Sequence, residues 1–349
     1  MVEWLVIGAD AKPAGRGVRG LALVWFLRTY HGRRAVRYLE PKDLLSNPSV
    51  HAQTVFLGLP TSLTAQQIAD LPNRTGCQRI VAFDYFDQHE LAWSEEQGAA
   101  FRSVGEVYLK PWKEPIWESL PEYANLQMGT LPIRRYGRFT WARRIDRLNQ
   151  LVRTRPEPEY DAAFLGRPNH TRFYMDGKIH RVDQRVDWML DLKRNAPDLK
   201  VWGGLVEVND KHRQVLEEKY GDVSDLLYQG SKVNFAKYWK NLCRSRVALA
   251  PGGNVPWTYR HYECLYAGNA VATLDYRERE MLVPLPTEGM THVPDGDSVV
   301  SAVREALQML RERPRLGEEN IAHLERYFKD ATYSRSRGAL WERFKDQLM

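Results

Sequence analysis

Hydrophobic and polar positions along residues 1–110 follow two alternating periods. Short runs rich in β-branched and aromatic residues are separated by segments with helical spacing, such as VRGLALVWFLRTY and the stretch after TSLTAQQIADL. The strand-like runs are EWLVIG, AVRYLE, TVFLGL, RIVAFDY and EVYLK. Strands that alternate with helices form parallel sheets with helices on both faces. The pattern therefore predicts an α/β domain at the start of the chain.

A second series of the same kind begins near residue 160. It predicts strands over YDAAFLG, LKVWGG, LLYQG, RVALAPGG, AVATLDY and THVPD, and helices over HRVDQRVDWMLDLKRN, KHRQVLEEKY, FAKYWKNLC and WTYRHYECLYAG. Residues 111–158 are rich in Pro, Trp and Arg and are expected to connect the two series, with RTRPEPEY as the linker. We therefore predict two Rossmann-like α/β domains, at 1–155 and 156–330, and a C-terminal helix at 331–349.

The composition of the 349 residues is that of an ordinary globular protein, with 43% hydrophobic residues. No apolar run approaches the roughly 20 residues that span a bilayer. The start of the chain carries Glu3 and lacks a basic segment followed by an apolar one, so we expect the protein to stay in the cytoplasm. Its three cysteines have no metal-ligand spacing and are expected to be reduced.

The net charge of +6 arises entirely from residues 1–155. Between residues 12 and 42, eight Lys and Arg residues are opposed only by Glu40, and between residues 134 and 155 eight Arg residues are opposed only by Asp146. Either cluster alone is compatible with a solvated basic surface. Two clusters in one half of the chain favour an anionic partner.

The stretch GADAKPAGRGVRG, residues 8–20, contains a G-x-G-x-x-G pattern after a strand. In a dinucleotide-binding fold the first glycine follows the strand directly, whereas here the strand ends near Gly8, seven residues before Gly15. Glu40, twenty residues after Gly20, does have the spacing of a ribose-binding carboxylate. We favour a glycine-rich loop that opens the first βα unit, and keep an NAD-dependent oxidoreductase as an alternative.

Residues 246–276 carry the most specific pattern of the chain. A buried strand leads into Gly252 and Gly253, and a helix is expected to begin near Thr258. Arg260 and Glu263 are three residues apart and so lie on one face of that helix. A cation there suits a diphosphate, and a carboxylate one turn later suits two ribose hydroxyls. The alternative is a capped amphipathic helix with an internal Arg–Glu pair.

This R-x-x-E pattern, followed by Ala-Gly and a strand, resembles the GT-B glycosyltransferases. The resemblance implies two Rossmann-like domains facing each other across a cleft, with a nucleotide sugar in the second domain and the last helix crossing back to the first. We expect the donor to be a UDP-sugar. It implies that Arg260 binds the diphosphate and Glu263 the ribose. It also suggests phosphate ligands in LGRPNHTRFY, which holds Arg167, His170 and Arg172, with a surface loop as the alternative. Residues 228–230 follow a predicted strand and would either frame the nucleobase with backbone groups or form an ordinary turn.

Inverting transfer needs a base in the first domain. Asp84, at the end of the strand RIVAFDY, is our candidate for this base, with Asp87 and His89 as alternatives. Asp84 could equally cap the turn that follows the strand. Some bacteriophage DNA glucosyltransferases are similar, with an aspartate after the corresponding strand and R-x-x-E in the donor helix. No D-x-D pair stands where a diphosphate-binding metal would be expected, and no His/Cys cluster has zinc spacing, so no metal is expected.

The charge pattern suggests that Arg16, Arg19, Arg143 and Arg144 bind the acceptor. A hydroxymethylated base in duplex DNA is the favoured acceptor, because a polyanion matches both basic clusters. Lipopolysaccharide or another surface glycan, which would bring peripheral contact with a membrane, is the first alternative. A non-catalytic nucleic-acid-binding protein and the oxidoreductase are the others.

Overall fold

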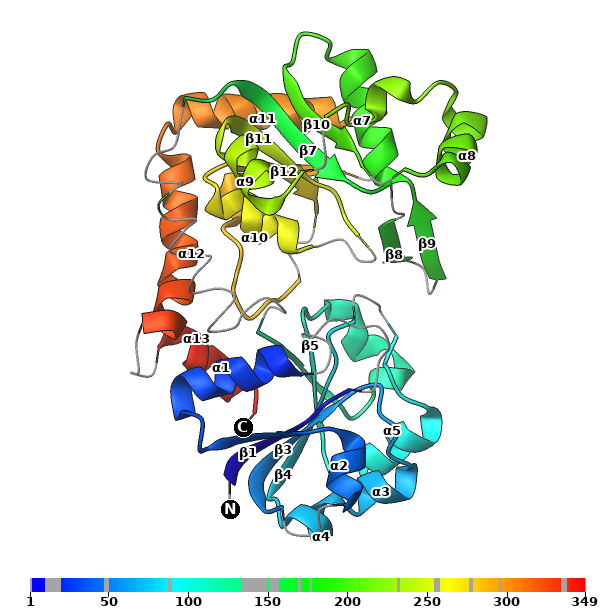
Figure 1. Ribbon diagram of the computed structural model, residues 1–349, viewed down its shortest axis with the longest axis vertical. Coiled ribbons are helices and arrows are strands. Elements are labelled where there is room, and N and C mark those ends of the chain that lie inside the picture. Colours follow the sequence, from blue (N-terminus) through cyan, green and yellow to red (C-terminus); the bar gives the residue numbers. More distant parts are fainter. Residues whose placement is uncertain are drawn as a thin grey trace. The chain divides into compact units, whose positions relative to one another are not determined.

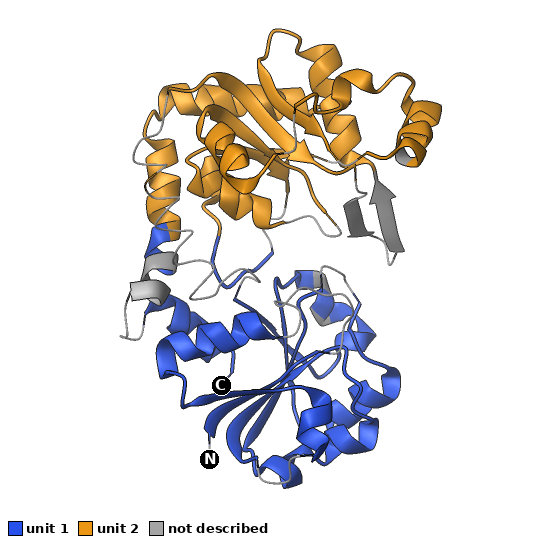
Figure 2. Cartoon of the chain, viewed as in Figure 1, with its two compact units in different colours: residues 1–145, 278–284, 325–349 blue, residues 146–277, 285–324 orange. Residues whose placement is uncertain are grey.

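The computed structural model describes residues 2–9, 20–46, 50–86, 90–132, 150, 157–168, 171–175, 178–206, 208–230, 233–253, 258–275, 279–294, 297–333 and 338–348. The chain divides into two compact units (Figure 2). Unit 1 contains residues 1–145, 278–284 and 325–349, and unit 2 contains residues 146–277 and 285–324. The division after residue 145 lies before the Pro-rich segment at which we placed the boundary, and unit 1 includes two later segments of the chain.

Unit 1 is built on a six-stranded parallel sheet with the order β2-β1-β3-β4-β5-β6. Figure 1 labels its strands β1, β3, β4 and β5. The strands are β1 (Val2–Ile7), β2 (Val36–Leu39), β3 (Ala52–Gly58), β4 (Arg79–Phe83), β5 (Val107–Lys110) and β6 (Gln127–Thr130). The helices between them are α1 (Leu21–His31), α2 (Pro41–Ser46), α3 (Ala65–Ala69), α4 (Leu71–Thr75) and α5 (Glu95–Arg102). The first five strands confirm the prediction, whereas β6 lies in the segment that we expected only to connect the domains.

The last helix, α13 (Ala339–Asp346), completes the core of unit 1. The Trp341 ring lies 4.5 Å from the ring of His31 and 5.9 Å from that of Trp4, measured between centroids. Phe344 lies 5.0 Å from Phe26 of α1. Aromatic rings bury large areas, so this helix covers apolar surface that β1 and α1 would otherwise expose.

Unit 2 is built on a five-stranded parallel sheet with the order β10-β7-β11-β12-β13. Its strands are β7 (Tyr160–Gly166), β10 (Val201–Leu205), β11 (Ser245–Ala250), β12 (Ala270–Leu274) and β13 (Met290–Val293). Its helices are α7 (Gln184–Asn195), α8 (Asp210–Tyr220), α9 (Phe235–Cys243), α10 (Tyr259–Tyr266), α11 (Val299–Glu312) and α12 (Leu316–Tyr333), the last of which continues into unit 1. The near-continuous apolar runs of these strands are typical of a sheet covered on both faces.

Two predicted elements of unit 2 differ from the structure. A separate antiparallel hairpin, β8 (Thr171–Met175) and β9 (Lys178–Val182), lies between β7 and α7 in the chain. The helix predicted from His180 onward therefore begins only at Gln184. The predicted strand LLYQG is reduced to a single parallel bridge between Leu205 and Leu227. Neither difference changes the order of the five parallel strands.

Candidate functional site

The strand order of unit 2 places a topological switch point between β7 and β11. The chain leaves β7 toward its neighbour β10, and it leaves β11 toward β12 on the other side of the sheet. Open α/β sheets bind ligands outside the carboxyl ends of their strands at such points. The segments that follow β7 and β11 are therefore the first place to look for a functional site.

Arg260, on the first turn of α10, is anchored at the carboxyl end of β7. Its Nη2 donates a hydrogen bond to the carbonyl oxygen of Leu165 at 2.6 Å. Its guanidinium lies over the ring of Phe164, 4.7 Å from the centroid. A guanidinium that stacks and donates to a neutral carbonyl keeps its positive charge. The residue predicted to face a diphosphate thus lies at the switch point.

A second arginine, Arg185, joins the segments that follow the two strands. Its Nε donates to the carbonyl oxygen of Gly252 and its Nη1 to that of Arg167, each at 3.0 Å. Burial, together with the nearby charge of Arg260, lowers the pKa of Arg185 to about 10. At neutral pH it therefore remains charged, in the neighbourhood of a like charge.

Sequence analysis did not single out Arg185, because it was assigned to the middle of a helix starting at His180. The structure places it at the second position of α7, directly after the hairpin. The Asp-Gly pair between TRFYM and KIHRV is typical of a two-residue hairpin turn. Recognising that signal would have placed Arg185 at the start of a helix.

Gly252 and Gly253 follow β11 and face the start of α7. The Gly252 amide donates to the side-chain oxygen of Gln184 at 2.8 Å. A Cβ atom at Gly253 would lie 3.4 Å from Nη2 of Arg185 and 3.1 Å from Cγ2 of Thr258. The missing side chain therefore keeps a narrow space between α7 and α10.

The start of α10 is fixed by a fully buried histidine. The Thr258 amide donates to Nδ1 of His261 at 3.0 Å, Nδ1 also lies 2.9 Å from the Thr258 carbonyl oxygen, and Nε2 is 2.7 Å from the Thr273 hydroxyl. That hydroxyl in turn donates to the carbonyl oxygen of Ala250. Burial is the main cause that lowers the pKa of His261 to about 4, so the ring is neutral at pH 7. The chain from His261 to Ala250 fixes α10, and with it Arg260, against β11 and β12.

Glu263 lies one turn after Arg260 on α10 and is half-buried. Its charge, with that of Arg260, acts on the Cys264 thiol, whose pKa is raised by burial to about 12. Arg260 and Glu263 therefore share one region of α10, as the R-x-x-E spacing requires. The role of Glu263 in binding a ribose stays a prediction.

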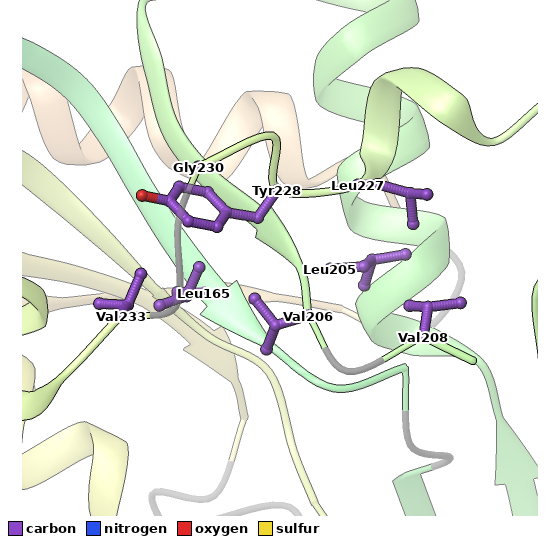
Figure 3. A pocket seen from close by; sticks show the side chains of 8 residues that line it. All are labelled: Leu165, Leu205, Val206, Val208, Leu227, Tyr228, Gly230 and Val233. Atoms are coloured by element: carbon purple, nitrogen blue, oxygen red, sulfur yellow. The ribbon is translucent and has the colours of Figure 1, made fainter.

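An open, mainly apolar cavity of about 660 Å³ lies beside this region (Figure 3). It is lined by Leu165, Leu205, Val206, Val208, Leu227, Tyr228, Gly230 and Val233. Leu165 links the cavity to the arginines, because its side chain lines the cavity and its carbonyl accepts from Arg260. Pockets that are mostly apolar with a few fixed polar groups are typical of small-molecule sites.

The remaining donor residues of the prediction fall in different places. Arg167 is exposed immediately after β7, and its carbonyl is the acceptor of Arg185. Arg172 lies within β8 of the hairpin, opposite Arg181, rather than in the loop after β7. His170 lies outside the described residues.

Asp84 follows β4 in unit 1 and is fully buried. Its Oδ2 accepts hydrogen bonds from Nζ of Lys110 at 2.9 Å and from the Tyr108 hydroxyl at 2.7 Å, and its Oδ1 accepts from the Phe86 amide at 2.8 Å. Lys110 also donates to the carbonyl oxygen of Glu90. The three donors hold the carboxylate in one orientation. Its role as a catalytic base stays a prediction.

The predicted acceptor residues Arg16, Arg19, Arg143 and Arg144 lie outside the described residues, as do Asp87 and His89. Of the first basic cluster, Arg33 and Arg34 are exposed, while Arg28 donates to the carbonyl oxygen of Val36 inside unit 1. At least one arginine of that cluster thus stabilises the fold.

The G-x-G-x-x-G segment does not follow its strand directly. β1 ends at Ile7 and α1 begins at Leu21, with Gly20 at a φ of +88° immediately before it. A Cβ at Gly20 would meet the Phe83 ring at 2.8 Å, so glycine is required there for both conformation and space. The backbone conformation and the packing at Gly20 thus explain the last glycine of the pattern without a nucleotide.

In the ranges that the structure describes, no three or more His, Cys, Asp or Glu side chains form a group that could hold a metal ion. Within the same ranges, no helix has the length and apolar character needed to cross a bilayer.

No protein-family model and no curated protein matches the chain. Among solved structures, the apo structure of OtsA has a TM-score of 0.51 at 12% identity, covering 100% of this chain and 99% of that one. The GtfA/B complex has a TM-score of 0.48 at 14% identity, and the match covers 88% of this chain and 59% of that one. UDP-GlcNAc 2-epimerase from Neisseria meningitidis bound to UDP-GlcNAc has a TM-score of 0.42 at 10% identity, covering 99% and 98%.

At these identities the likeness concerns the fold alone. The two parallel-sheet α/β units and the match to OtsA along the whole chain confirm the predicted fold class, the paired Rossmann-like units of GT-B proteins.

Proposed function

We propose that the protein is a nucleotide-sugar-dependent glycosyltransferase whose donor binds to unit 2 at the carboxyl ends of β7 and β11. The observation that carries the proposal is the position of Leu165. Its side chain lines a cavity large enough for a nucleoside, and its carbonyl anchors Arg260 at 2.6 Å. An apolar pocket and a fixed cation that meet at one residue suit a ligand with an aromatic base and a phosphate group.

In this arrangement the nucleobase lies between Leu165 and Tyr228, and its backbone partners come from residues 205–206 and 227–230. Glu263 accepts hydrogen bonds from the ribose hydroxyls, and Arg260 binds the phosphates. A carboxylate and a guanidinium on one helix face match the two polar parts of a nucleotide. The whole-chain likeness to OtsA supports the fold that this donor site requires.

During transfer, the bond between the anomeric carbon and the terminal phosphate oxygen breaks, and the acceptor oxygen bonds to that carbon. The leaving diphosphate takes up negative charge, which a fixed guanidinium stabilises without having to reorganise. The acceptor hydroxyl gives up its proton to a base. Asp84 is our candidate base for an inverting reaction, and its carboxylate accepts hydrogen bonds from Lys110 and Tyr108.

For the acceptor we propose an anionic molecule, because the excess positive charge of the chain lies in residues 1–155. A hydroxymethylated base in duplex DNA is the first acceptor to test, and a lipopolysaccharide or other surface glycan the second. DNA binding should weaken steeply with salt through counterion release. A phosphorylated glycolipid carries fewer charges, so its salt dependence should be shallower.

The proposal is tested by thermal unfolding with UDP-, GDP-, ADP- and CMP-sugars and with NAD. A ligand at 100 times its Kd stabilises the native state by about 2.7 kcal/mol, which raises the melting temperature measurably. One class of nucleotide sugar should stabilise the protein. Stabilisation by NAD alone would support the oxidoreductase, and stabilisation by none of these ligands would refute the proposed site.

The donor that stabilises best is then incubated alone and with each acceptor, and the products are separated. Transfer of the sugar to an acceptor supports a glycosyltransferase. Conversion of the nucleotide sugar to an isomer without any acceptor would instead indicate an epimerase on the same fold.

A further inference from the structure

We propose that Arg185 and Arg260 form a two-arginine clamp for the diphosphate of the donor, so that nucleoside diphosphates bind far more tightly than nucleoside monophosphates. The clamp rests on the proposed nucleotide site and adds a residue, Arg185, to which the sequence motif gave no role.

The two guanidiniums are anchored to alternate residues at the end of one strand. Arg260 donates to the carbonyl oxygen of Leu165, and Arg185 donates to that of Arg167. Carbonyl groups two residues apart in an extended chain are separated by about 7 Å. Two guanidiniums held by these nearby carbonyls suit two linked phosphates, each of which can accept from one guanidinium.

Within the described part of the chain, neither Arg185 nor Arg260 forms an ion pair with a carboxylate, and the hydrogen bonds of both go to backbone carbonyls. Bringing two like charges together has a cost that an anion between them removes. The arrangement is therefore that of a site prepared for a ligand with at least two negative charges.

Nη2 of Arg185 faces Gly253. Nη2 of Arg185 makes no hydrogen bond to the described part of the chain, and it lies 3.4 Å from the position of a Cβ at Gly253. The other wall of this space is Cγ2 of Thr258, 3.1 Å from that position. A side chain at 253 would occupy the space into which Arg185 can donate.

Because Arg185 also fixes the carbonyls of Gly252 and Arg167, its loss could act through the loops rather than through the ligand. A loop effect would lower the affinity for every nucleotide equally. Loss of a phosphate contact would lower the affinity for diphosphates selectively. The ratio of diphosphate to monophosphate affinity therefore separates the two roles.

The test is isothermal titration calorimetry with UDP and UMP, GDP and GMP, ADP and AMP, and inorganic pyrophosphate. The wild type should bind the diphosphate of its preferred base at least tenfold more tightly than the monophosphate. Arg185→Gln should weaken diphosphate and pyrophosphate binding about 10- to 100-fold, as expected for a charged hydrogen bond, and monophosphate binding less than threefold. Arg185→Lys, which keeps the charge but not the two carbonyl contacts, should fall in between.

Arg194→Gln is the matched control, since it removes the same charge from the exposed last turn of α7 and should leave all affinities unchanged. If Arg185→Gln does not fold, Gly253→Ala tests the clamp instead, because its methyl group narrows the space beside Arg185 without removing a charge. Gly253→Ala should also weaken diphosphate binding selectively.

Equal affinities of the wild type for diphosphate and monophosphate, or equal losses for both in the variants, would overturn the clamp and leave the nucleotide site in place. Binding of no nucleotide at all would instead refute the proposed function.

Discussion

Asp84 and Lys110 form an ion pair in which neither side chain is exposed, with Nζ and Oδ2 2.9 Å apart. Asp84 follows β4 and Lys110 ends β5, and the register Phe83↔Leu109 brings the two residues opposite each other. Removing one partner of such a pair leaves a buried charge without compensation, which typically costs about 3–5 kcal/mol. The pair thus connects the candidate base to the stability of unit 1.

Asp84→Asn is expected to lower the free energy of unfolding by about 3–5 kcal/mol in urea titrations. The double variant Asp84→Asn/Lys110→Met should regain at least half of this loss, because no uncompensated charge remains. If Asp84 is also the catalytic base, both variants should lose transfer about 10²- to 10⁴-fold under conditions where they are folded. A folded double variant that transfers sugar at the wild-type rate would show that Asp84 is structural only.

His261 predicts a pH dependence of stability. Its pKa in the folded protein is about 4, below the ordinary value of 6.5, so the unfolded chain binds the proton first as the pH falls. His261 therefore contributes about 3 kcal/mol to the free energy of unfolding above pH 6.5, and this contribution is lost as the pH falls toward 4.

Unfolding free energies measured between pH 7 and pH 4 test this expectation. Between pH 7 and pH 4, the unfolding free energy of His261→Gln should fall by about 3 kcal/mol less than that of the wild type. His51→Gln, which changes an exposed histidine, should keep the wild-type slope. Parallel curves for the wild type and His261→Gln would contradict the buried neutral histidine.

Much of the fold follows from local patterns, and so does one half of the site. The apolar runs gave every strand of the unit 2 sheet, and the spacing of Arg260 and Glu263 placed both on α10 because helical periodicity depends on neighbouring residues only. The Asp84–Lys110 pair is different. It joins residues 26 apart through the register of two strands, which the pattern along either strand does not specify.

Arg185 was missed for a related reason. Its contacts with Gly252 and Arg167 join segments 67 and 18 residues away, and they depend on which strands are neighbours in the sheet. The hairpin β8–β9 also moved the start of α7 by four residues relative to the prediction, from His180 to Gln184. Long-range pairing and one unrecognised turn account for both differences.

Filling the cavity should block the nucleobase and spare the phosphates. Val206→Phe adds a ring to the cavity wall, so nucleoside diphosphate affinity should fall at least tenfold while pyrophosphate affinity stays within threefold. Val215→Phe on α8, where the side chain is 57% exposed, is the control for added bulk and should change neither affinity. Calorimetry with both ligands separates the outcomes, and unchanged nucleotide binding by Val206→Phe would place the base elsewhere.

Glu263→Ala should weaken nucleotide-sugar binding by about 1.5–3 kcal/mol, the range for a lost charged hydrogen bond, without altering the fold. The 2′-deoxy form of the same nucleotide should bind wild type and variant more equally, because it lacks one of the hydroxyls that the carboxylate would hold. Glu305→Ala, on the exposed side of α11, serves as the control. Undiminished affinity in a folded Glu263→Ala protein would remove the ribose role.

The most direct measurement is a crystal structure of the protein with the nucleotide that stabilises it best. The base should lie in the cavity between Leu165 and Tyr228, with the phosphates within hydrogen-bond distance of Arg260. A nucleotide found outside unit 2, or one that leaves this cavity empty, would contradict a donor site at the carboxyl ends of β7 and β11.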